Sequence, residues 1–599
     1  MIFYDLEVFK YDWLGVFIDT DTRQEHVIVN DTHLLYKLYC DNIKNIWVGY
    51  NNKHYDKYIV LGIIFGLNPK EINDKIIIKH MEGWQISDVF RNSKMINYDL
   101  MPNDMKSLKV LEGYKGHNIK ETSVPFNIDR RLTKEEIEET IKYCRTDVHE
   151  TIDNFMCTID EFNAIFDIIK AFPNQVNISN IGDSEARITA KVLGCERHDY
   201  NDEFDFYVLP CVNVTKYKEV VDWFNECARE AKELNLNQAD EKTKQEWYKS
   251  KSLTIDVAGV PHTFGFGGCH GAPKEPIHLV GGLYHVDVNN YYPSFLLAHG
   301  MVTRSARNNN YDLVYKTRKQ LKEKQMNAKT KEQSKAFKKA QLPYKKMLNA
   351  LSGAMKDKAN PAYDPRNNNI MCINGQLMLL DLIEHLEIIP GFNLAQSNTD
   401  GLIIQLPDTD EAFDMMDDIC YDWECRMSTE KCSIGLATDQ IAEIYQKDVN
   451  NYLWIDLDGG VERIGAYVKE LGPLDFDLPI INQALVDYMV NKIPVETTIN
   501  ECKDLIMFQK IVKLSTKYEY VEHNGIKYDY KCYRVFASRD ASDGKILKCR
   551  SGNNPAKFGN TPDSCFIFND DVNDAPIPTK LNKQWYIDLA KKRLKDFGL

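Results

Sequence analysis

Hydrophobic and polar positions alternate in two distinct ways over the first two hundred residues. In residues 2–9 (IFYDLEVF) two acidic side chains, two positions apart, interrupt an apolar run, which predicts a strand. Residues 133–152 instead carry apolar side chains at helical spacing, at Ile137, Ile141, Cys144, Val148 and Ile152. Thr133 and Glu136 have the spacing of a capping box, so this helix is expected to begin beside them. Strand and helix patterns in alternation predict an α/β domain.

The rest of the chain has fewer strand patterns. Strand-like runs appear at 281–288 and 401–406, and the pattern between them is mostly helical. Residues 228–252 are polar and charged, which favours an exposed helix or a connector. The glycine-rich stretch 263–272 (TFGFGGCHGA) lets the backbone approach a ligand or another chain closely, although a plain turn explains it equally well. Pro343 is expected to start or kink the helix that contains it.

Composition narrows the class of protein. A chain of 599 residues, 43% of them hydrophobic, can form roughly three to five domains. No run reaches the ~18 consecutive apolar residues of a membrane helix, and the N-terminus does not resemble a secretory signal. We therefore expect a cytoplasmic location and no membrane partner. Fifteen cysteines occur without a C-x-x-C pair, which predicts reduced thiols, no disulfide and no structural zinc.

Charge is distributed unevenly along the chain. Residues 316–346 contain twelve Lys or Arg and two Glu, a net charge of +10 within a chain whose net charge is -14. Such a local excess is typical of a polyanion site on an acidic protein, although a solvated helical hairpin without a ligand would look the same. Arg318 and Lys322 are four residues apart on one helical face, and further on a face is shared by Lys338, Lys345 and Asn349.

A first group of carboxylates lies in the N-terminal α/β pattern. Asp5 and Glu7 would lie side by side on one strand face, where like charges are unfavourable unless water or a cation relieves them. An exposed strand face is the simpler interpretation of this pair alone. Asp56 follows a turn-rich segment, and Tyr143 and Asp147 lie four residues apart beside the apolar stripe of the predicted helix. Carboxylates are the ligands that Mg²⁺ prefers, and two such ions can promote phosphodiester hydrolysis.

The second group consists of Asp287 and Asp400. Asp287 ends a strand pattern in YHVDVNNYYPSF (residues 284–295), and Asp400 lies at the Asp-Gly bend of the strand-turn-strand pattern FNLAQSNTDGLIIQL. Either acid alone is explained by a solvated strand end or an ordinary turn.

Taken in order, these motifs resemble those of family B DNA polymerases of phage type with a DEDDy 3′–5′ proofreading exonuclease. The exonuclease motifs are matched by Asp5-x-Glu7, by Asn51 with Tyr55 and Asp56, and by Tyr143-x-x-x-Asp147; the palm motifs are matched by Asp287–Ser294, by Lys345 with the KMLNALSG segment and by Ser397–Gly401. The resemblance covers roughly residues 1–410. It implies an α/β and α+β multidomain fold, in which an RNase H-like exonuclease domain precedes a right-hand polymerase.

The resemblance also implies domain boundaries and partners. The domains would be the exonuclease (1–205), a connector or start of the palm (206–255), the first palm part (256–308), the fingers (309–356), the second palm part (357–480) and, by position only, the thumb (481–599). The partners would be primer–template DNA, deoxynucleoside triphosphates and, in the exonuclease site, a single-stranded DNA 3′ end, with other replication proteins as further candidates. A phage-encoded member would work in the cytoplasm of its bacterial host.

Roles for single residues follow from the resemblance as well. Two Mg²⁺ ions, which Mn²⁺ could replace, would be held in the exonuclease domain by Asp5, Glu7, Asp56 and Asp147, with Tyr143 orienting the attacking water. Two more ions would be held in the palm by Asp287, Val288 and Asp400. The incoming nucleotide would be bound by Tyr292, Arg318, Lys322, Lys338, Lys345 and Asn349. DNA would be contacted by Gly267, Gly268, Tyr467 and Lys469, with Lys517 as a rival for the last two.

Some positions depart from the family pattern. Asn398 replaces the first Asp of D-T-D, and Ala350 and Ser352 replace Ser and Tyr of the second palm motif. Only about fifty residues separate the first two palm motifs, which favours a nucleic-acid primer, because protein-primed members of the family carry long insertions between the palm motifs. The alternatives are a protein-primed polymerase, or an exonuclease or DNA-binding replication protein with an inactive palm.

Overall fold

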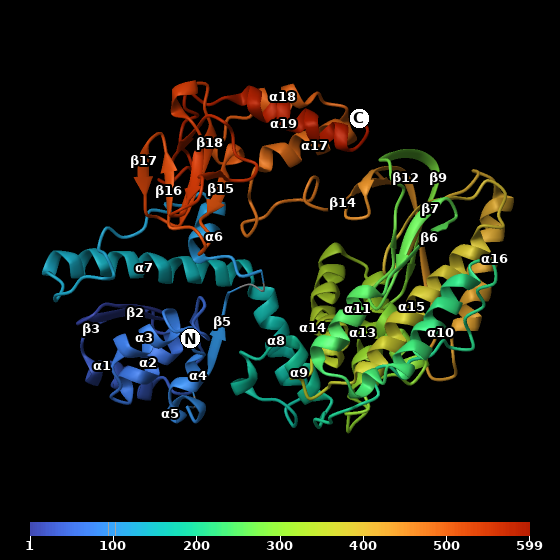
Figure 1. Cartoon of the computed structure of the whole chain (residues 1–599), viewed down its shortest axis with the longest axis horizontal. Helices are drawn as coiled ribbons and strands as arrows, with labels where there is room; N and C mark the ends of the chain where they lie inside the picture. Colours follow the sequence, from blue (N-terminus) through green and yellow to red (C-terminus); the bar gives the residue numbers. More distant parts are fainter. Residues whose placement is uncertain (94, 102–103) are drawn as a thin grey trace. The chain divides into compact units, whose positions relative to one another are not determined.

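The computed structural model describes residues 1–93, 95–101 and 104–599, which form two compact units of mixed helices and strands (Figure 1). Unit 1 contains Met1–Asp183, Leu471–Ala484 and Pro494–Leu589, and unit 2 contains Ser184–Glu470, Leu485–Ile493 and Ala590–Leu599. The mixed α/β, multidomain character predicted from the sequence is confirmed. Within the described ranges, no helix combines the length with the apolar content that crossing a membrane requires.

The N-terminal part of unit 1 is built on a five-stranded sheet. Its strand order is β3-β2-β1-β4-β5, and its bounds are β1 (Ile2–Val8), β2 (Trp13–Asp19), β3 (Gln24–Val29), β4 (Trp47–Gly49) and β5 (Asn97–Asp99). The central strand β1 is antiparallel to β2 and parallel to β4. Tyr4, Leu6 and Trp47 belong to one hydrophobic core. Since side chains alternate along a strand, Asp5 and Glu7 leave β1 on the face opposite to Tyr4 and Leu6.

Helices surround this sheet. They are α1 (Thr32–Asp41), α2 (Asp56–Ile64), α3 (Pro69–Ile77), α4 (Gly83–Ile86), α5 (Asp88–Arg91), α6 (Leu108–Tyr114), α7 (Lys134–Cys157) and α8 (Ile159–Ala171). The long helix α7 packs on β1 and β2. The predicted capping box at its N-terminus is confirmed, because Thr133 Oγ1 accepts from the backbone N–H of Glu136 and the Glu136 carboxylate accepts from that of Thr133.

Two smaller sheets complete unit 1, and we call them the C-terminal sheets (residues 510–567). One has the order β15-β18-β21 (Lys510–Lys513, Cys532–Ala537, Cys565–Ile567), and the other β17-β16-β19-β20 (Ile526–Tyr528, Tyr520–His523, Ile546–Cys549, Ala556–Lys557). Helix α18 (Val495–Glu501) lies in unit 1, whereas α17 (Pro479–Asn491) and α19 (Lys583–Asp596) begin in unit 1 and end in residues assigned to unit 2. Figure 1 shows α6 between α7 and the strands β15 and β18, and α6 contacts all three.

Unit 2 contains a nine-stranded antiparallel sheet of order β14-β13-β12-β9-β11-β10-β8-β7-β6. Its strands are β6 (Leu253–Val257), β7 (Val260–Phe264), β8 (His270–Gly271), β9 (Ile277–Val288), β10 (Asn393–Ser397), β11 (Gly401–Gln405), β12 (Leu436–Asp448), β13 (Asn451–Asp456) and β14 (Val461–Ile464). The strand runs expected at 281–288 and 401–406 correspond to β9 and β11. Because β9 lies between β11 and β12, its C-terminal end is held from both sides.

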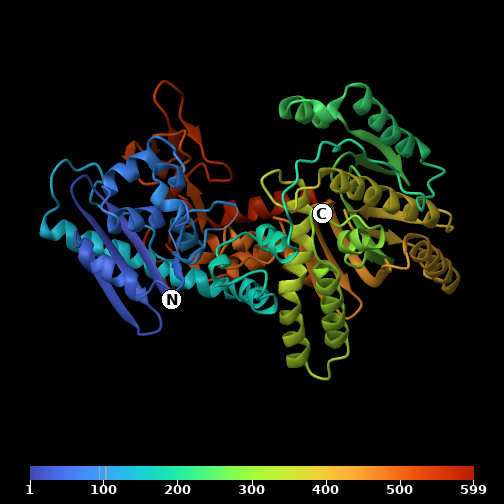
Figure 2. The ribbon, with the colours of Figure 1, turned by 90° about the horizontal axis from the view of Figure 1, so that it is seen from below.

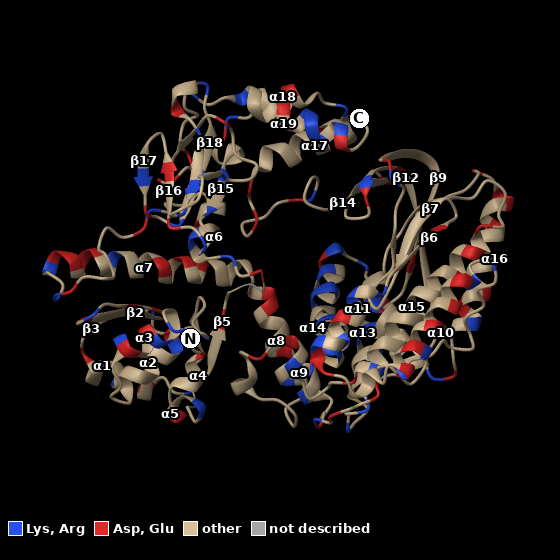
Figure 3. Cartoon of the chain, viewed as in Figure 1, with Lys and Arg blue, Asp and Glu red and all other residues tan. Residues whose placement is uncertain are grey.

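The helices of unit 2 include a hairpin that carries the basic segment. They are α9 (Glu185–Val192), α10 (Lys218–Glu233), α11 (Glu241–Ser250), α12 (Tyr291–Ala298), α13 (Asn310–Met326), α14 (Lys331–Lys356), α15 (Pro365–Leu386) and α16 (Asp410–Met427). Figure 2 shows α13 and α14 side by side, and Figure 3 shows Lys and Arg along them.

Of the two alternatives expected for Pro343, that it starts or kinks its helix, the first is wrong. Pro343 does not start a helix, because α14 runs unbroken from Lys331 to Lys356 with the proline inside it. The helix loses one backbone hydrogen bond there. Helix α14 packs against α9 and α13, and Pro343 itself is buried.

Candidate active sites

The first site lies on β1 and α7. Asp5 and Glu7 share one face of β1, and α7 packs across this strand with Asp147. Carboxylate oxygens of Asp5, Glu7 and Asp147 lie within 4.8 Å of one another. Three of the four acids predicted from the sequence are therefore brought together by the fold.

Burial disfavours the ionised form of these acids. It raises the pKa of Asp5 and Glu7 well above the usual range, and the negative charges of Asp56 and Asp147 add to the effect. Asp56, the first residue of α2, has a pKa raised to about 7, mainly by burial. Its Oδ1 is buried and has no hydrogen-bond partner among the described residues. An orphaned oxygen beside like charges fits a divalent cation, so this donor set suits Mg²⁺.

A lysine that sequence reasoning missed completes the site. Lys109 Nζ donates to Asp147 Oδ1 (2.8 Å) and to both carboxylate oxygens of Glu112 (3.0 and 2.9 Å). It also lies 4.6 Å from the centre of the Tyr143 ring. Burial opposes the charge of Lys109, but Asp147 and Glu112 outweigh burial and raise its pKa. The ion pair joins α6 to α7, so the only local signal was the spacing of Lys109 and Glu112 on one helix face.

The second site lies at the C-terminal end of β9. Gly401 of β11 pairs with Asp287, and the backbone N–H of Val288 donates to the carbonyl oxygen of Asp400 (2.8 Å). The strand register therefore places Asp287 and Asp400 next to each other, as the motifs predict. Burial raises the pKa of Asp287 to about 7, the charge of Asp400 adds to the shift, and Lys322 opposes it.

A cavity of about 380 Å³ opens beside these two acids. Helices α12, α13 and α14 supply its other walls. Of the residues predicted from the sequence, those that line it are Asp287, Val288, Tyr292, Arg318, Lys345, Asn349 and Asp400. Carboxylates and cations thus face one space, which is the arrangement that a metal-bound phosphate ester requires.

Arg318 lines this cavity, whereas Lys322 and Lys338 do not belong to its lining. Arg318 donates to the side-chain oxygen of Asn290, and Lys322 Nζ donates to Asn289 Oδ1 (2.8 Å). Both lysine and arginine therefore contact the turn after Asp287. Lys338 is exposed on α14, about two turns before Lys345, and is not brought to the cavity lining.

The glycine-rich stretch packs against the turn that carries Asp400. Gln376 of α15 donates through Nε2 to the carbonyl oxygens of Gly265 and Gly267, both at 2.8 Å. A Cβ atom at Gly268 would lie 2.7 Å from Thr399 Oγ1, whereas a Cβ at Gly267 would meet nothing within 4 Å. Gly268 thus approaches the chain's own turn at Thr399, and the DNA contact of Gly267 and Gly268 stays a prediction.

The other predicted DNA contacts belong to two different units. Tyr467 follows β14 in a turn, where its hydroxyl donates to Asp596 Oδ2 (3.3 Å) and the Arg593 guanidinium lies 4.7 Å from its ring centre. Lys469 lies two residues further on in the same unit. Lys517 lies in a turn between β15 and β16, and therefore belongs to unit 1.

A second cavity, of about 230 Å³, shares Asp287 and Asp400. Its further lining includes aromatic and amide side chains that the sequence had not singled out: His285, Gln396, Tyr452 and Trp454. Asn398 also lines it, and its Oδ1 accepts from the backbone N–H of Thr399 (2.8 Å). Asn398 therefore shapes the turn that presents Asp400.

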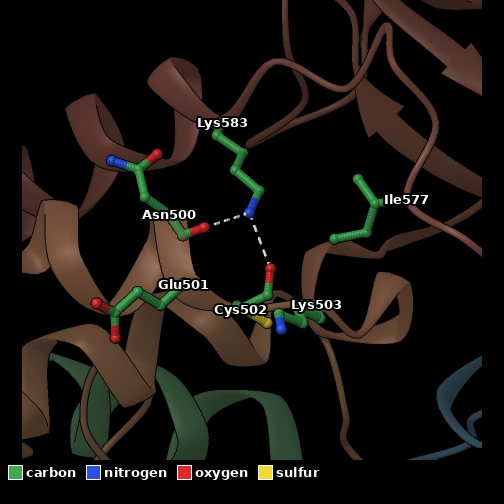
Figure 4. A pocket seen from close by; sticks show the side chains of 6 residues that line it. All are labelled: Asn500, Glu501, Cys502, Lys503, Ile577 and Lys583. Carbon is green, nitrogen blue, oxygen red and sulfur yellow. Dashed lines mark hydrogen bonds between the residues drawn. The ribbon is translucent and has the colours of Figure 1, made fainter.

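Another cavity, of about 650 Å³, lies at the end of α18 in unit 1 (Figure 4). Lys583 Nζ donates there to the carbonyl oxygens of Asn500 and Cys502, both at 2.8 Å. Lysines commonly satisfy the free carbonyls of a helix C-terminus in this way. Lys583 therefore has a structural role as a helix cap.

Comparison with known proteins finds similarity among solved structures. No protein-family model and no curated protein matches the sequence. Among solved structures, the chain is similar to the family B DNA polymerase from the hyperthermophilic archaeon Pyrobaculum calidifontis, at 12% sequence identity and a TM-score of 0.40. The alignment covers 99% of this chain and 77% of that chain.

Proposed function

We propose that this chain is a DNA-directed DNA polymerase with a 3′–5′ exonuclease site. Its substrates would be deoxynucleoside triphosphates and primer–template DNA at the Asp287 site, and a single-stranded 3′ end at the Asp5 site. The observation that carries the proposal is one cavity in which Asp287 and Asp400 face Arg318 and Lys345. Phosphoryl transfer needs mainly positioning and charge compensation, and these four residues can provide both.

In the Asp287 site, each group has a role that its place supports. Asp287 and Asp400 would hold two Mg²⁺ ions, which would lower the pKa of the primer 3′-hydroxyl and neutralise the triphosphate. Arg318 and Lys345 face the space for the phosphates. Tyr292 would lie beneath the sugar, and Asn398 would keep the turn in place through its hydrogen bond to Thr399.

In the Asp5 site, hydrolysis would depend on the carboxylates of Asp5, Glu7, Asp56 and Asp147. Lys109 holds one oxygen of Asp147, which favours the ionised carboxylate and fixes its orientation. Tyr143 would orient the attacking water beside it.

The short segment of chain between the first two palm motifs supports the use of a nucleic-acid primer. Residues 288–345 are all described, and they consist of the end of β9, helices α12 and α13, the first half of α14 and short connections. This part of unit 2 holds no inserted domain that could receive a priming protein. We propose fingers at residues 309–356 and, on the same resemblance, an enzyme of a phage or a mobile element.

The test is a gel assay on a 5′-labelled primer annealed to a longer template, with Mg²⁺, with and without deoxynucleotides. Wild type is compared with Asp400→Ala and Asp5→Ala. Two controls remove one exposed carboxylate from each unit: Asp408→Ala after β11 and Glu138→Ala on α7. We expect Asp400→Ala to lose extension by ~100-fold or more while still shortening the primer, because charge stabilisation by a metal contributes several kcal/mol. Asp5→Ala should do the reverse.

The outcomes separate the two activities. Extension that survives in Asp400→Ala would refute the polymerase site, and primer shortening that survives in Asp5→Ala would refute the exonuclease site. If wild type shortens the primer but never extends it, the chain is an exonuclease with an inactive palm.

A further inference from the structure

The end of α6 and the loop after it, residues 113–119 (called the loop below), are held by side chains and backbone from the C-terminal part of unit 1. The hydrogen bonds are Arg534 Nη2 to the carbonyl oxygens of Gly113 (3.2 Å) and His117 (2.7 Å), Gln509 Nε2 to that of Tyr114 (3.2 Å), Asn573 Nδ2 to that of Lys115 (3.0 Å), Val572 N to that of Gly116 (2.9 Å), and Ile119 N to that of Asn569 (2.9 Å). Nearly every peptide group of the loop is therefore fixed by residues some four hundred positions away.

Apolar packing joins the same two parts of the chain as the hydrogen bonds do. Val110 and Ile119 form one buried cluster with Ile511 of β15 and Cys532 of β18. Gly116 adopts a positive φ of 81°, and a Cβ atom there would lie 2.7 Å from Asn573 Oδ1 and 2.8 Å from Ile506 Cδ1. Only glycine fits so close an approach at this φ. The loop and the C-terminal sheets are thus one packed structure.

Arg534 is at the centre of this contact. It is fully buried in β18, and its other guanidinium N–H groups donate to Gln509 Oε1 (2.9 Å) and to the carbonyl oxygen of Asp570 (2.6 Å). All of these acceptors are neutral, so burying the charge is costly. Burial lowers the pKa of Arg534 to about 10. The planar fork of five N–H donors joins two chain segments at once, which a lysine ammonium cannot do in the same geometry.

The other side of the same segment contacts α7 at the carboxylate site. Lys109, on α6, binds Asp147, and Lys115 and His117, in the loop, bind Glu150 one helical turn later. The position of α6 against α7 is therefore set from one side by Asp147 and Glu150. From the opposite side it is set by Arg534 and its neighbours.

We propose that Arg534 is a positioning residue for the Asp5–Glu7–Asp147 site, acting through α6 to hold Lys109 against Asp147. The C-terminal sheets would then be part of the nuclease rather than an independent module. The effect on activity rests on the proposed exonuclease function, whereas the effect on the loop does not.

A double-mutant cycle tests the proposal. Hydrolysis of a single-stranded oligonucleotide is measured at saturating Mg²⁺ for wild type, Arg534→Met, Lys109→Gln and the double variant. We expect Arg534→Met to lower kcat by about 10- to 100-fold, the range for groups that orient the ligands of a metal. If Arg534 acts through Lys109, the double variant is no slower than the slower single variant. Multiplied losses would overturn the proposal.

Two further variants separate positioning from general destabilisation. Val535→Ala removes a fully buried side chain from the same strand, but Val535 belongs to the core of the C-terminal sheets and not to the loop contact. It should leave kcat unchanged, and a loss equal to that of Arg534→Met would overturn the proposal. If Arg534→Met does not fold, Asn573→Ala removes a single loop bond from an exposed side chain and should lower kcat in the same direction.

Amide hydrogen exchange tests the loop without any activity. Residues 109–119 should exchange faster in Arg534→Met than in Val535→Ala, and equal exchange would refute the proposed positioning. If wild type and Asp5→Ala do not differ in hydrolysis, the exonuclease function fails. In that case the exchange result still decides whether Arg534 holds α6.

Discussion

Replacing Gly268 by alanine tests whether the glycine-rich stretch fixes the Asp400 turn. The added Cβ would lie 2.7 Å from Thr399 Oγ1 and 3.1 Å from Thr399 Cγ2. Thr399 precedes Asp400 directly, and its backbone N–H is bound by Asn398. Gly267→Ala is the matched control, because a Cβ at Gly267 meets nothing within 4 Å. Both changes add the same methyl group to neighbouring positions of one stretch.

The structure sets the size of the effect. An ordinary contact begins near 3.4 Å, so Thr399 has to move by about 0.7 Å to accept the new methyl group. Overpacking of this kind costs about 1–3 kcal/mol when the neighbours cannot give. A displacement of about 1 Å at a catalytic group can cost ~100-fold in rate, so we expect Gly268→Ala to slow extension by roughly 10- to 100-fold.

The assay is single-turnover primer extension with saturating deoxynucleotides, beside thermal unfolding of each variant. Gly268→Ala should extend slowly although the protein is folded, while Gly267→Ala extends like wild type. Equal rates for the two variants would refute the link between the glycine-rich stretch and Asp400. A rate loss shared by both would show that the stretch contributes flexibility instead of close packing.

Two further predictions concern charge. Without metal, the folded state binds a proton at Asp287 more tightly than the unfolded chain does, so ionisation of Asp287 costs stability as pH rises from about 4 through about 7. Asp287→Asn should therefore raise Tm at pH 8, and this gain should disappear near pH 4. Mn²⁺ should raise Tm more for wild type than for the variant. A Tm difference between variant and wild type that does not change with pH would contradict the raised pKa of Asp287. Lys109→Met should cost about 3–5 kcal/mol at pH 7.5, because Glu112 and Asp147 lose a buried cation. Urea unfolding measures this cost, and the loss should shrink as pH falls and the two acids protonate.

Patterns within short segments of the sequence predicted the features that depend on those segments alone. The alternation of β1 put Asp5 and Glu7 on one face, the capping box located the start of α7, and strand patterns located β9 and β11. Contacts between segments far apart in the sequence could not be predicted from such patterns. Pro343 is tolerated inside α14 because other helices pack there, which a propensity rule does not register. Lys109 and Arg534 are ordinary residues in their own segments, and their partners lie tens to hundreds of positions away.

The way the chain returns on itself also affects the order in which its parts can form on the ribosome. Residues 113–119 must wait for residues 509–573 before their peptide groups are satisfied. Some four hundred residues lie between these segments, which corresponds to roughly 20–80 s of synthesis at about 5–20 residues per second. Most of unit 2, Ser184–Glu470, is continuous and emerges during that interval. If the loop contact positions Lys109 as proposed, the Asp5–Glu7–Asp147 site is completed only after residues 509–573 have been made, although its own carboxylates are among the first residues synthesised.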